Sequence, residues 1–338
     1  MRHRLREALA ANGVAVRRMS PEDRLLRSGY DPRHGPDATS SAYLQPSNPR
    51  LCELEGLYSL VASDPLSPNA TESTWRAASA SSVDDLHYFR GDNLYLWQYT
   101  RSVEMNRLRS FIYYRATASA DELSLLGVLD EDGAFGCLTF DFDGKTVSRD
   151  LLDSVNELSF IARHTDLFSS TDAGVLDVGA GYGRLAHRML VATSGVSRFY
   201  CVDAVARSTF LCEFYLRFRG LGERSNVVDL GAFQKGDHGI ARGTVDLATN
   251  VHSFSEMPRH SVEAWVRWLG ELEVRHLFVV PNERERILSR EPDGQRLDCA
   301  DLFTRYGYGL KVVEPALADA EVRRVLDVED MFLLFERS

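Results

Sequence analysis

The sequence predicts an α/β fold in which a mostly parallel, seven-stranded sheet follows a mostly helical N-terminal half. From residue 173 on, short apolar runs alternate with amphipathic segments of helical period, and a glycine-rich turn follows the first run. Strands that alternate with helices pair in parallel, with helices on both faces of the sheet. Composition agrees, since 44% of the 338 residues are hydrophobic and 26% are charged, as in ordinary globular proteins.

The N-terminal half shows helical spacing in several places, broken by polar stretches. In chain order, we expect a helix at 4–12, a helix at 49–63, a loop at 62–82, a helix at 93–115, a short helix at 121–129, a strand at 134–142, and a helix that begins after Ser148-Arg149-Asp150. We read Arg149 and Asp150 as helix-capping residues. Residues 1–42 are then an arm, 43–168 a mostly helical lid or substrate subdomain, and 169–338 the sheet domain, with a boundary near 165–172.

The C-terminal half supplies the strands of the sheet and the helices between them. The predicted strands are 174–178, 199–202, 226–230, 245–250, 276–280, 310–313 and 331–335, and the predicted helices are 184–193, 207–219 and 261–271. Because no clear helix separates the last two strands, we expect one of them to run antiparallel.

A glycine-rich segment, Asp177-Val-Gly179-Ala-Gly181-Tyr-Gly183, ends the first predicted strand and opens a helix. Glycine lets the backbone turn tightly and approach a ligand, and the helix N-terminus offers free N–H groups. The second strand ends in Asp203, whose carboxylate can accept both hydroxyls of a ribose. The alternatives are a dinucleotide enzyme and an inactive relative, although the spacing GxGxG differs from the dinucleotide pattern GxGxxG.

This segment resembles the first motif of class I methyltransferases, which use S-adenosylmethionine (SAM). The resemblance implies a seven-stranded, Rossmann-like sheet and a SAM site after its first strands. The residues that we expect to contact SAM are Asp177, Gly179, Ala180, Gly181, Gly183, Asp203, Ala204, Leu230 and Asn250.

Further segments resemble the sugar O-methyltransferases of bacterial natural-product pathways. The similar segments are 89–98, 131–136, 148–153, 249–257 and 280–283, and the resemblance runs from about Tyr43 onward. It implies methyl transfer to a deoxysugar hydroxyl of a glycosylated small molecule. The alternatives are an aglycone hydroxyl or nitrogen, a nucleotide-sugar and, from a different class, a non-catalytic SAM-binding scaffold.

The expected catalytic residues, His252 and Glu256, follow the fourth strand. A sugar hydroxyl is a poor nucleophile and needs a base, and an imidazole is a base near neutral pH. Glu256, four residues on, could orient the imidazole. The alternatives are a packing role for His252 and a magnesium site of His252, Glu256 and either Asp246 or Glu283. Magnesium prefers oxygen ligands, so we expect no metal requirement.

A polar and aromatic cluster in the N-terminal half could bind the acceptor, together with Glu283 after the fifth strand. The cluster comprises Arg90, Asp92, Asn93, Trp97 and Gln98. Planar polar groups and aromatic faces suit sugars, but a core Trp97 and a structural ion pair between Arg90 and Asp92 explain the pattern equally well.

The net charge and the length of the apolar runs limit the kinds of partner that we expect. The formal net charge of −10 disfavours nucleic acid and anionic membranes, and no apolar run is long enough to span a bilayer. The five cysteines, with no CxxC pair, indicate reduced thiols. We therefore expect a soluble, cytoplasmic protein with a small-molecule partner, and a homodimer remains open.

Overall fold

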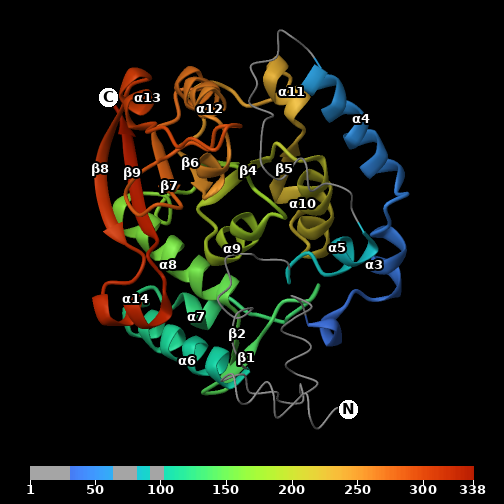
Figure 1. The fold of residues 1–338 in the computed structure, drawn as a ribbon, viewed down its shortest axis with the longest axis vertical. Coiled ribbons are helices and arrows are strands. Elements are labelled where there is room, and N and C mark those ends of the chain that lie inside the picture. The colour runs from blue at the N-terminus through green and yellow to red at the C-terminus, as the bar shows by residue number, and fades with distance from the viewer. Residues whose placement is uncertain (1–30, 64–81, 92–102) are drawn as a thin grey trace, which may run out of the picture.

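The computed structural model describes residues 31–63, 82–91 and 103–338, and its centre is a seven-stranded sheet (Figure 1). The strands are β3 (Ala173–Val178), β4 (Val196–Val202), β5 (Ser225–Val228), β6 (Leu247–Val251), β7 (His276–Val280), β8 (Tyr308–Pro315) and β9 (Met331–Arg337). Their order is β5-β4-β3-β6-β7-β9-β8, and β9 runs antiparallel to both of its neighbours. This is the sheet of the class I methyltransferase fold, and the predicted fold class is confirmed.

Helices cover both faces of the sheet and form most of the N-terminal half. They are α3 (Ala38–Tyr43), α4 (Pro49–Ser63), α5 (Val83–His87), α6 (Val103–Ala120), α7 (Leu125–Val128), α8 (Arg149–His164), α9 (Arg184–Ala192), α10 (Ala206–Phe218), α11 (Leu230–Lys235), α12 (Arg259–Glu271), α13 (Ala300–Arg305) and α14 (Ala320–Leu326).

Side chains alternate between the two faces of the sheet, as the pleat of a strand requires. On β3, Val175 packs in one buried cluster with α8 and α9, and Leu176 packs in another with α11, α12 and α13. On β7, Phe278 packs in the same cluster as Val175, and Leu277 packs in the same cluster as Leu176. The apolar face of α8 therefore belongs to the same core as the sheet, although α8 lies on the N-terminal side of the predicted boundary. That boundary itself stays a prediction.

Two predictions about the N-terminal half were wrong in detail. Residues 134–142 are not one strand, because Phe135 and Gly136 have φ of +61° and +83° and turn the chain. The alternating pattern came from a buried loop, and only β1 (Phe140–Phe142) is extended, pairing with β2 (Lys145–Val147). The predicted helix at 93–115 corresponds to α6, which is described from residue 103 and continues to residue 120. Residues 93–102 and the predicted helix at 4–12 lie outside the described residues.

The last two strands are separated by a helix that the sequence analysis overlooked. Asp319 caps α14 by accepting hydrogen bonds from the backbone N–H groups of Glu321 and Val322. Figure 1 shows α14 beside α6, beneath the sheet. The predicted antiparallel strand is nevertheless confirmed, and it is β9.

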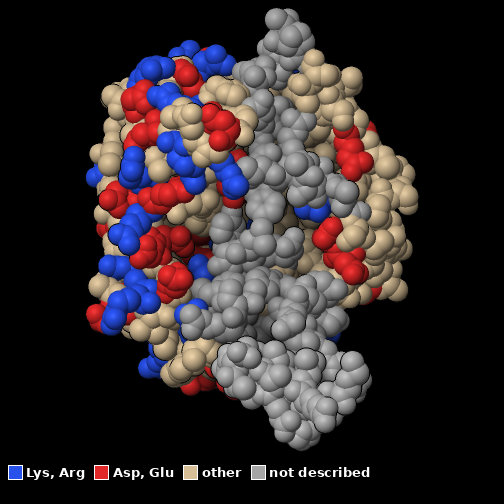
Figure 2. Space-filling model, viewed as in Figure 1, with Lys and Arg blue, Asp and Glu red and all other residues tan. Residues whose placement is uncertain are grey.

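Charges of both signs are mixed over one part of the surface. Figure 2 shows Lys and Arg side chains interleaved with Asp and Glu over the part of this face formed near β8, β9 and α13. Within the described residues, no helix has the length and apolar character that a bilayer crossing would require.

Candidate active site

The glycine-rich segment turns from β3 into α9 with left-handed backbone at each of its three glycines, at φ of +78°, +56° and +87°. A Cβ on Gly179 would lie 2.1 Å from Ser253 Oγ, and one on Gly183 would lie 3.0 Å from Cys212 Sγ. A Cβ on Gly181 would meet no atom within 4 Å. Gly179 and Gly183 thus allow close packing, whereas Gly181 borders open space.

Asp203 lies at the end of β4, beside this turn, and is almost fully buried. Its Oδ2 accepts a 2.9 Å hydrogen bond from Gly181 N–H, and its Oδ1 accepts one of 2.8 Å from Val205 N–H. A carboxylate has about four acceptor positions, so both oxygens can still accept bonds from a diol. No ion pair within the described residues reaches Asp203, and burial raises its pKa to about 7.

Asp177 is a second buried carboxylate at the same edge of the sheet. The hydroxyl of Thr249 donates a 2.7 Å hydrogen bond to its Oδ1, and burial raises the pKa of Asp177 to about 6. The neighbouring negative charges of Asp177 and Glu256 also raise the pKa of Asp203. The turn therefore faces carboxylates that a cationic ligand would stabilise in their ionised form.

A cavity of about 310 Å³ opens at this edge of the sheet. Most of the predicted site residues that the structure describes line it: Arg90, Asp177, Gly179, Ala180, Gly181, Asp203, Ala204, His252 and Glu256. The strand order decides how they are spread, because β4 and β9 lie on opposite sides of β3, β6 and β7. Asp203 follows β4, and Asp330 precedes the antiparallel β9, so the two residues mark opposite ends of the cavity.

Four predicted residues do not line the cavity. Gly183 packs against α10, and the buried side chain of Leu230 lies in the core. Asn250 donates to the carbonyl oxygen of Val178 at 2.9 Å and accepts from Phe254 N–H at 2.9 Å, so its amide joins the ends of β6 and β3. Glu283 forms an ion pair with Arg296.

His252 lines the middle of the cavity, since β6 lies between β3 and β7. Its backbone has φ of +67°, a left-handed conformation that is uncommon for a non-glycine residue. A 2.7 Å hydrogen bond from His252 N–H to the carbonyl oxygen of Val280 fixes the turn after β6. The surrounding structure thus holds this imidazole at the junction between the two ends of the cavity.

Side chains of α6, α8 and the start of β9 form a further part of the cavity, and the sequence analysis missed them or read them as structural. We call it the α8 half, and its residues are Tyr113, Arg149, Asp150, Asp153, Glu157, Asp330 and Phe332. Tyr113 donates a 2.6 Å hydrogen bond to Asp153, and Arg149 lies 3.2 Å from Asp153 and 3.6 Å from Asp330. The spacing of Asp150, Asp153 and Glu157 places three carboxylates on one helix face, and this signal could have revealed them.

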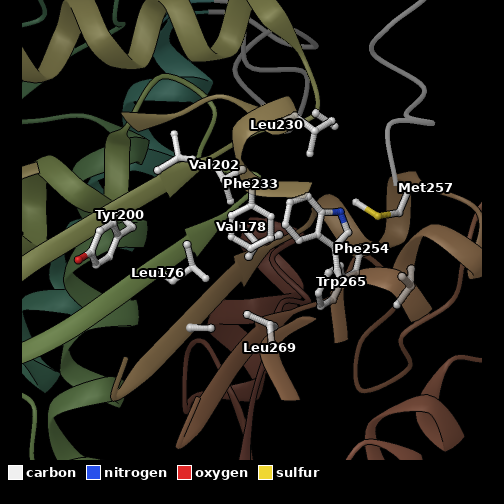
Figure 3. Close-up of a cluster of buried hydrophobic side chains, with 14 of the residues drawn as sticks. Leu176, Val178, Tyr200, Val202, Leu230, Phe233, Phe254, Met257, Trp265 and Leu269 are labelled. Carbon is white, nitrogen blue, oxygen red and sulfur yellow. The ribbon is translucent and has the colours of Figure 1, made fainter. Parts of the chain in front are cut away.

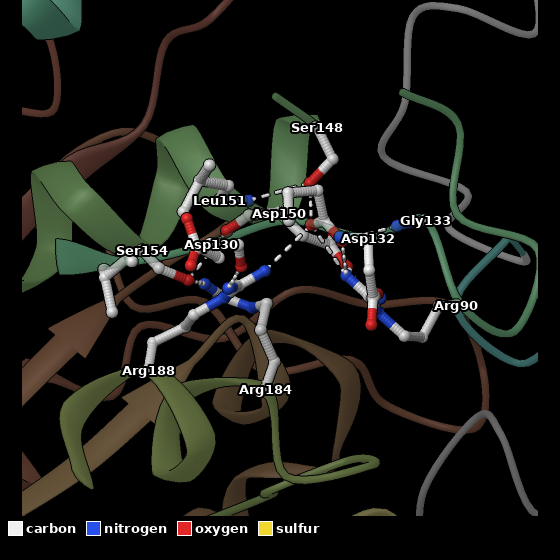
Figure 4. A network of polar contacts seen from close by, with 12 residues as sticks. Arg90, Asp130, Asp132, Gly133, Ser148, Asp150, Leu151, Ser154, Arg184 and Arg188 are labelled. Atoms are coloured by element: carbon white, nitrogen blue, oxygen red, sulfur yellow. Dashed lines mark hydrogen bonds and ion pairs between the residues drawn. The ribbon is translucent and has the colours of Figure 1, made fainter. Parts of the chain in front are cut away.

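Arg90 lines the cavity but is committed to a buried ion network. Its guanidinium lies 2.8 Å from Glu131, which also pairs with Arg188 at 2.8 Å and accepts a 2.6 Å hydrogen bond from the hydroxyl of Ser148. Figure 4 shows Arg90 and Arg188 directed into one network with Ser148. A structural ion pair of Arg90 is therefore present, and it is formed with Glu131. The other cluster members, Asp92, Asn93, Trp97 and Gln98, lie outside the described residues.

Asp246 lies too far from His252 to share a magnesium ion with it. Asp246 precedes β6 and accepts from Gly174 N–H at 2.9 Å, whereas His252 follows β6, so the two lie at opposite ends of the strand. Among the residues that the structure describes, no three His, Cys, Asp or Glu side chains gather in a way that could hold a metal ion.

Comparisons with solved structures return only distant similarities. The [4+2]-cyclase SpnF matches 68% of this chain and 95% of its own, at 14% identity and a TM-score of 0.41. Residues 961–1257 of StiE, an O-methyltransferase segment, match 54% and 73%, at 12% identity and a TM-score of 0.39. A protein of the NADB-Rossmann superfamily from Streptococcus agalactiae matches 54% and 68%, at 16% identity and a TM-score of 0.35. Likenesses at this level say nothing of activity. No family model and no curated protein matches the chain.

Proposed function

We propose that the protein is a SAM-dependent O-methyltransferase that methylates a sugar hydroxyl of a glycosylated small molecule. The observation that carries the proposal is the position of His252, held in a strained backbone conformation between the glycine turn with Asp203 and the α8 half. Strained residues of this kind cluster at functional sites.

The residues at the Asp203 end fit the cofactor. Asp203 has acceptor positions left for the two ribose hydroxyls, and Gly179 and Gly181 bring the backbone to the cavity without side chains. The buried carboxylates of Asp177 and Asp203 suit a ligand with a positive charge. When bound, SAM supplies a methyl group on a sulfonium sulfur.

The remaining chemistry falls to side chains of this chain. His252 takes the proton of the acceptor hydroxyl as that oxygen becomes a nucleophile, a role that contributes about 10²–10⁴ in rate. The α8 half holds the acceptor, since Tyr113, Arg149 and Asp153 present several donors and acceptors to hydroxyl groups there. Glu256 lies close enough to raise the pKa of Asp203, so its charge also acts on the Asp203 end.

Mass spectrometry of reaction products tests the proposal. The protein is incubated with SAM and a panel of deoxysugar glycosides, their aglycones and nucleotide-deoxysugars, with and without EDTA. We expect a methyl group on the sugar fragment of a glycoside, whether or not EDTA is present. A methyl group only on aglycones or only on nucleotide-sugars would overturn the sugar-glycoside assignment, and dependence on the metal would overturn metal-free base catalysis.

His252→Ala tests the base. We expect turnover to fall about 10²–10⁴-fold with the SAM dissociation constant retained. The matched control is His260→Ala, because His260 is exposed at the start of α12 and does not line the cavity. An unchanged rate in His252→Ala would remove the base assignment.

A further inference from the structure

The side chain of Trp265, on α12, is buried to 99% and also lines the cavity. Among the residues that the structure describes, none accepts a hydrogen bond from its indole N–H. A buried donor left without a partner is unfavourable, so native proteins rarely retain one unless something else satisfies it. A ligand in the cavity that Trp265 lines can supply that partner.

Packing places Trp265 at the Asp203 end of the cavity. Its ring lies 5.2 Å from that of Phe233 on α11, the helix that follows β5, and β5 is the neighbour of β4. Asp203, Ala204 and Val205 follow β4 and line the same cavity. Trp265 therefore lines the part of the cavity that borders α11 and the segment with Met257.

Met257 is the neighbour that covers the indole edge. Figure 3 shows the indole nitrogen on the edge of the ring that points toward Met257, whose flexible thioether side chain lines the cavity too. Methionine rearranges readily around a ligand because it is unbranched and has several rotatable bonds. A small movement of this side chain would expose the N–H to the cavity.

We infer that the indole N–H of Trp265 donates a hydrogen bond to an unprotonated ring nitrogen of a purine nucleoside. This rests on the proposed function, because a ribose held by Asp203 has its base on one side and the reacting group on the other. The reacting group faces His252, so the base extends from the ribose toward β5 and α11, where Trp265 packs against Phe233. A purine ring nitrogen is an acceptor, and Ala204, Met257 and Trp265 all line the cavity.

Isothermal titration calorimetry with S-adenosylhomocysteine (SAH) tests this in Trp265→Phe, which removes the N–H and keeps an aromatic ring. We expect the dissociation constants of SAH and SAM to rise by the same factor, about threefold to tenfold, which is the typical worth of one hydrogen bond. The matched control is Trp268→Phe, since the Trp268 ring lies 5.1 Å from that of Trp265 but does not line the cavity. Unchanged SAH affinity in Trp265→Phe would overturn the inference.

Ligand analogues identify the accepting nitrogen. The 1-deaza, 3-deaza and 7-deaza forms of SAH each replace one ring nitrogen by C–H, and only the analogue that lacks the accepting nitrogen should bind wild type and Trp265→Phe equally well. Additive losses for all three analogues would contradict a hydrogen bond to a ring nitrogen.

NMR of the wild-type protein gives a readout that does not depend on the folding of a variant. We expect the ¹⁵N-labelled indole N–H signal of Trp265 to move downfield when SAH is added, while that of Trp268 stays in place. A Trp265 signal that does not move would overturn the inference. If wild type binds neither SAM nor SAH, the cofactor assignment fails instead, so the two failures are distinguishable.

Discussion

The hydroxyl group of Tyr58, on α4, donates a 3.0 Å hydrogen bond to the backbone carbonyl oxygen of Asp203. The same hydroxyl lies 2.6 Å from Thr209 Oγ1 and accepts a 3.3 Å hydrogen bond from Leu230 N–H. One side chain of the N-terminal half thus joins the ends of β4 and β5, next to the carboxylate that we assign to the ribose. Leu230, predicted as a cofactor contact, is instead a partner of Tyr58 through its backbone.

Tyr58→Phe should destabilise the protein by about 1–3 kcal/mol, because it leaves buried backbone groups of Asp203 and Leu230 without their partner. Urea denaturation measures the free energy of unfolding. Tyr43→Phe is the control, since the Tyr43 hydroxyl bonds only the exposed Arg217 among the described residues. Equal losses in the two variants would contradict a special role for Tyr58.

SAM affinity should rise with pH between about 5.5 and 7.5. In the folded protein the pKa of Asp203 is raised to about 7 from 3.8 and that of Asp177 to about 6, so both carboxyl groups become ionised near this window. The unfolded chain ionises them from about pH 4, so the free energy of unfolding falls between about pH 4 and pH 7. A bound cation favours the ionised forms, so binding releases protons and tightens as pH rises. Calorimetry should show that the affinity for SAM depends more steeply on pH than the affinity for SAH, whose sulfur is uncharged. In Asp203→Asn, the affinity for SAM should depend less steeply on pH than in wild type. A flat profile for SAM in wild type would refute this account.

Glu131→Gln should destabilise the protein by about 3–5 kcal/mol, because Arg90 and Arg188 would remain as buried charges without their anion. The pKa of Glu131 lies well below its ordinary value, since the two guanidinium groups offset its desolvation. Its contribution is therefore present above the unfolded-state pKa and is lost only in strong acid. Glu329→Gln is the control, because its ion pair with Arg284 is exposed and should not measurably change unfolding.

Gly179→Ala and Gly181→Ala should fail in different ways. At Gly179 the new Cβ would collide with Ser253 Oγ, and at φ of +78° it would also be strained, so we expect a stability loss of about 2–4 kcal/mol. Adding Ser253→Gly should restore part of that loss. At Gly181 the Cβ enters open space and adds only the strain of the left-handed backbone at φ of +56°, so the stability loss should be smaller than at Gly179, and SAM affinity should fall because the Cβ borders the cavity. The comparison uses thermal unfolding and calorimetry, and equal stability losses in the two variants would contradict it.

The sheet, the glycine turn and Asp203 could be predicted because each depends on local pattern. Periodicity gives the strands, and the glycines at 179, 181 and 183 lie where left-handed backbone is needed. The use of a polar side chain could not be predicted in this way. Asn250 and Arg90 have types that suit ligands, but their partners, Val178 and Glu131, are distant in sequence and meet them only in the folded chain.

The α8 half was harder to predict because it depends on which side of a buried helix faces the cavity. Residues 149–153 read as a helix start, and Ser148 does cap α8. Only the packing of α8 against the sheet turns Asp150 and Asp153 toward the cavity, beside Asp330, which comes from the other end of the chain.

The position of β9 has a consequence for biosynthesis. β8 borders the sheet only through β9, so β8 cannot join β7 until residues 331–337 have left the ribosome. Asp330 and Phe332 arrive with that same strand, so the α8 half is completed later in translation than the glycine turn and Asp203. In a nascent chain stalled before residue 330, the proposed cofactor end of the cavity is therefore synthesised while the proposed acceptor end still lacks two of its residues.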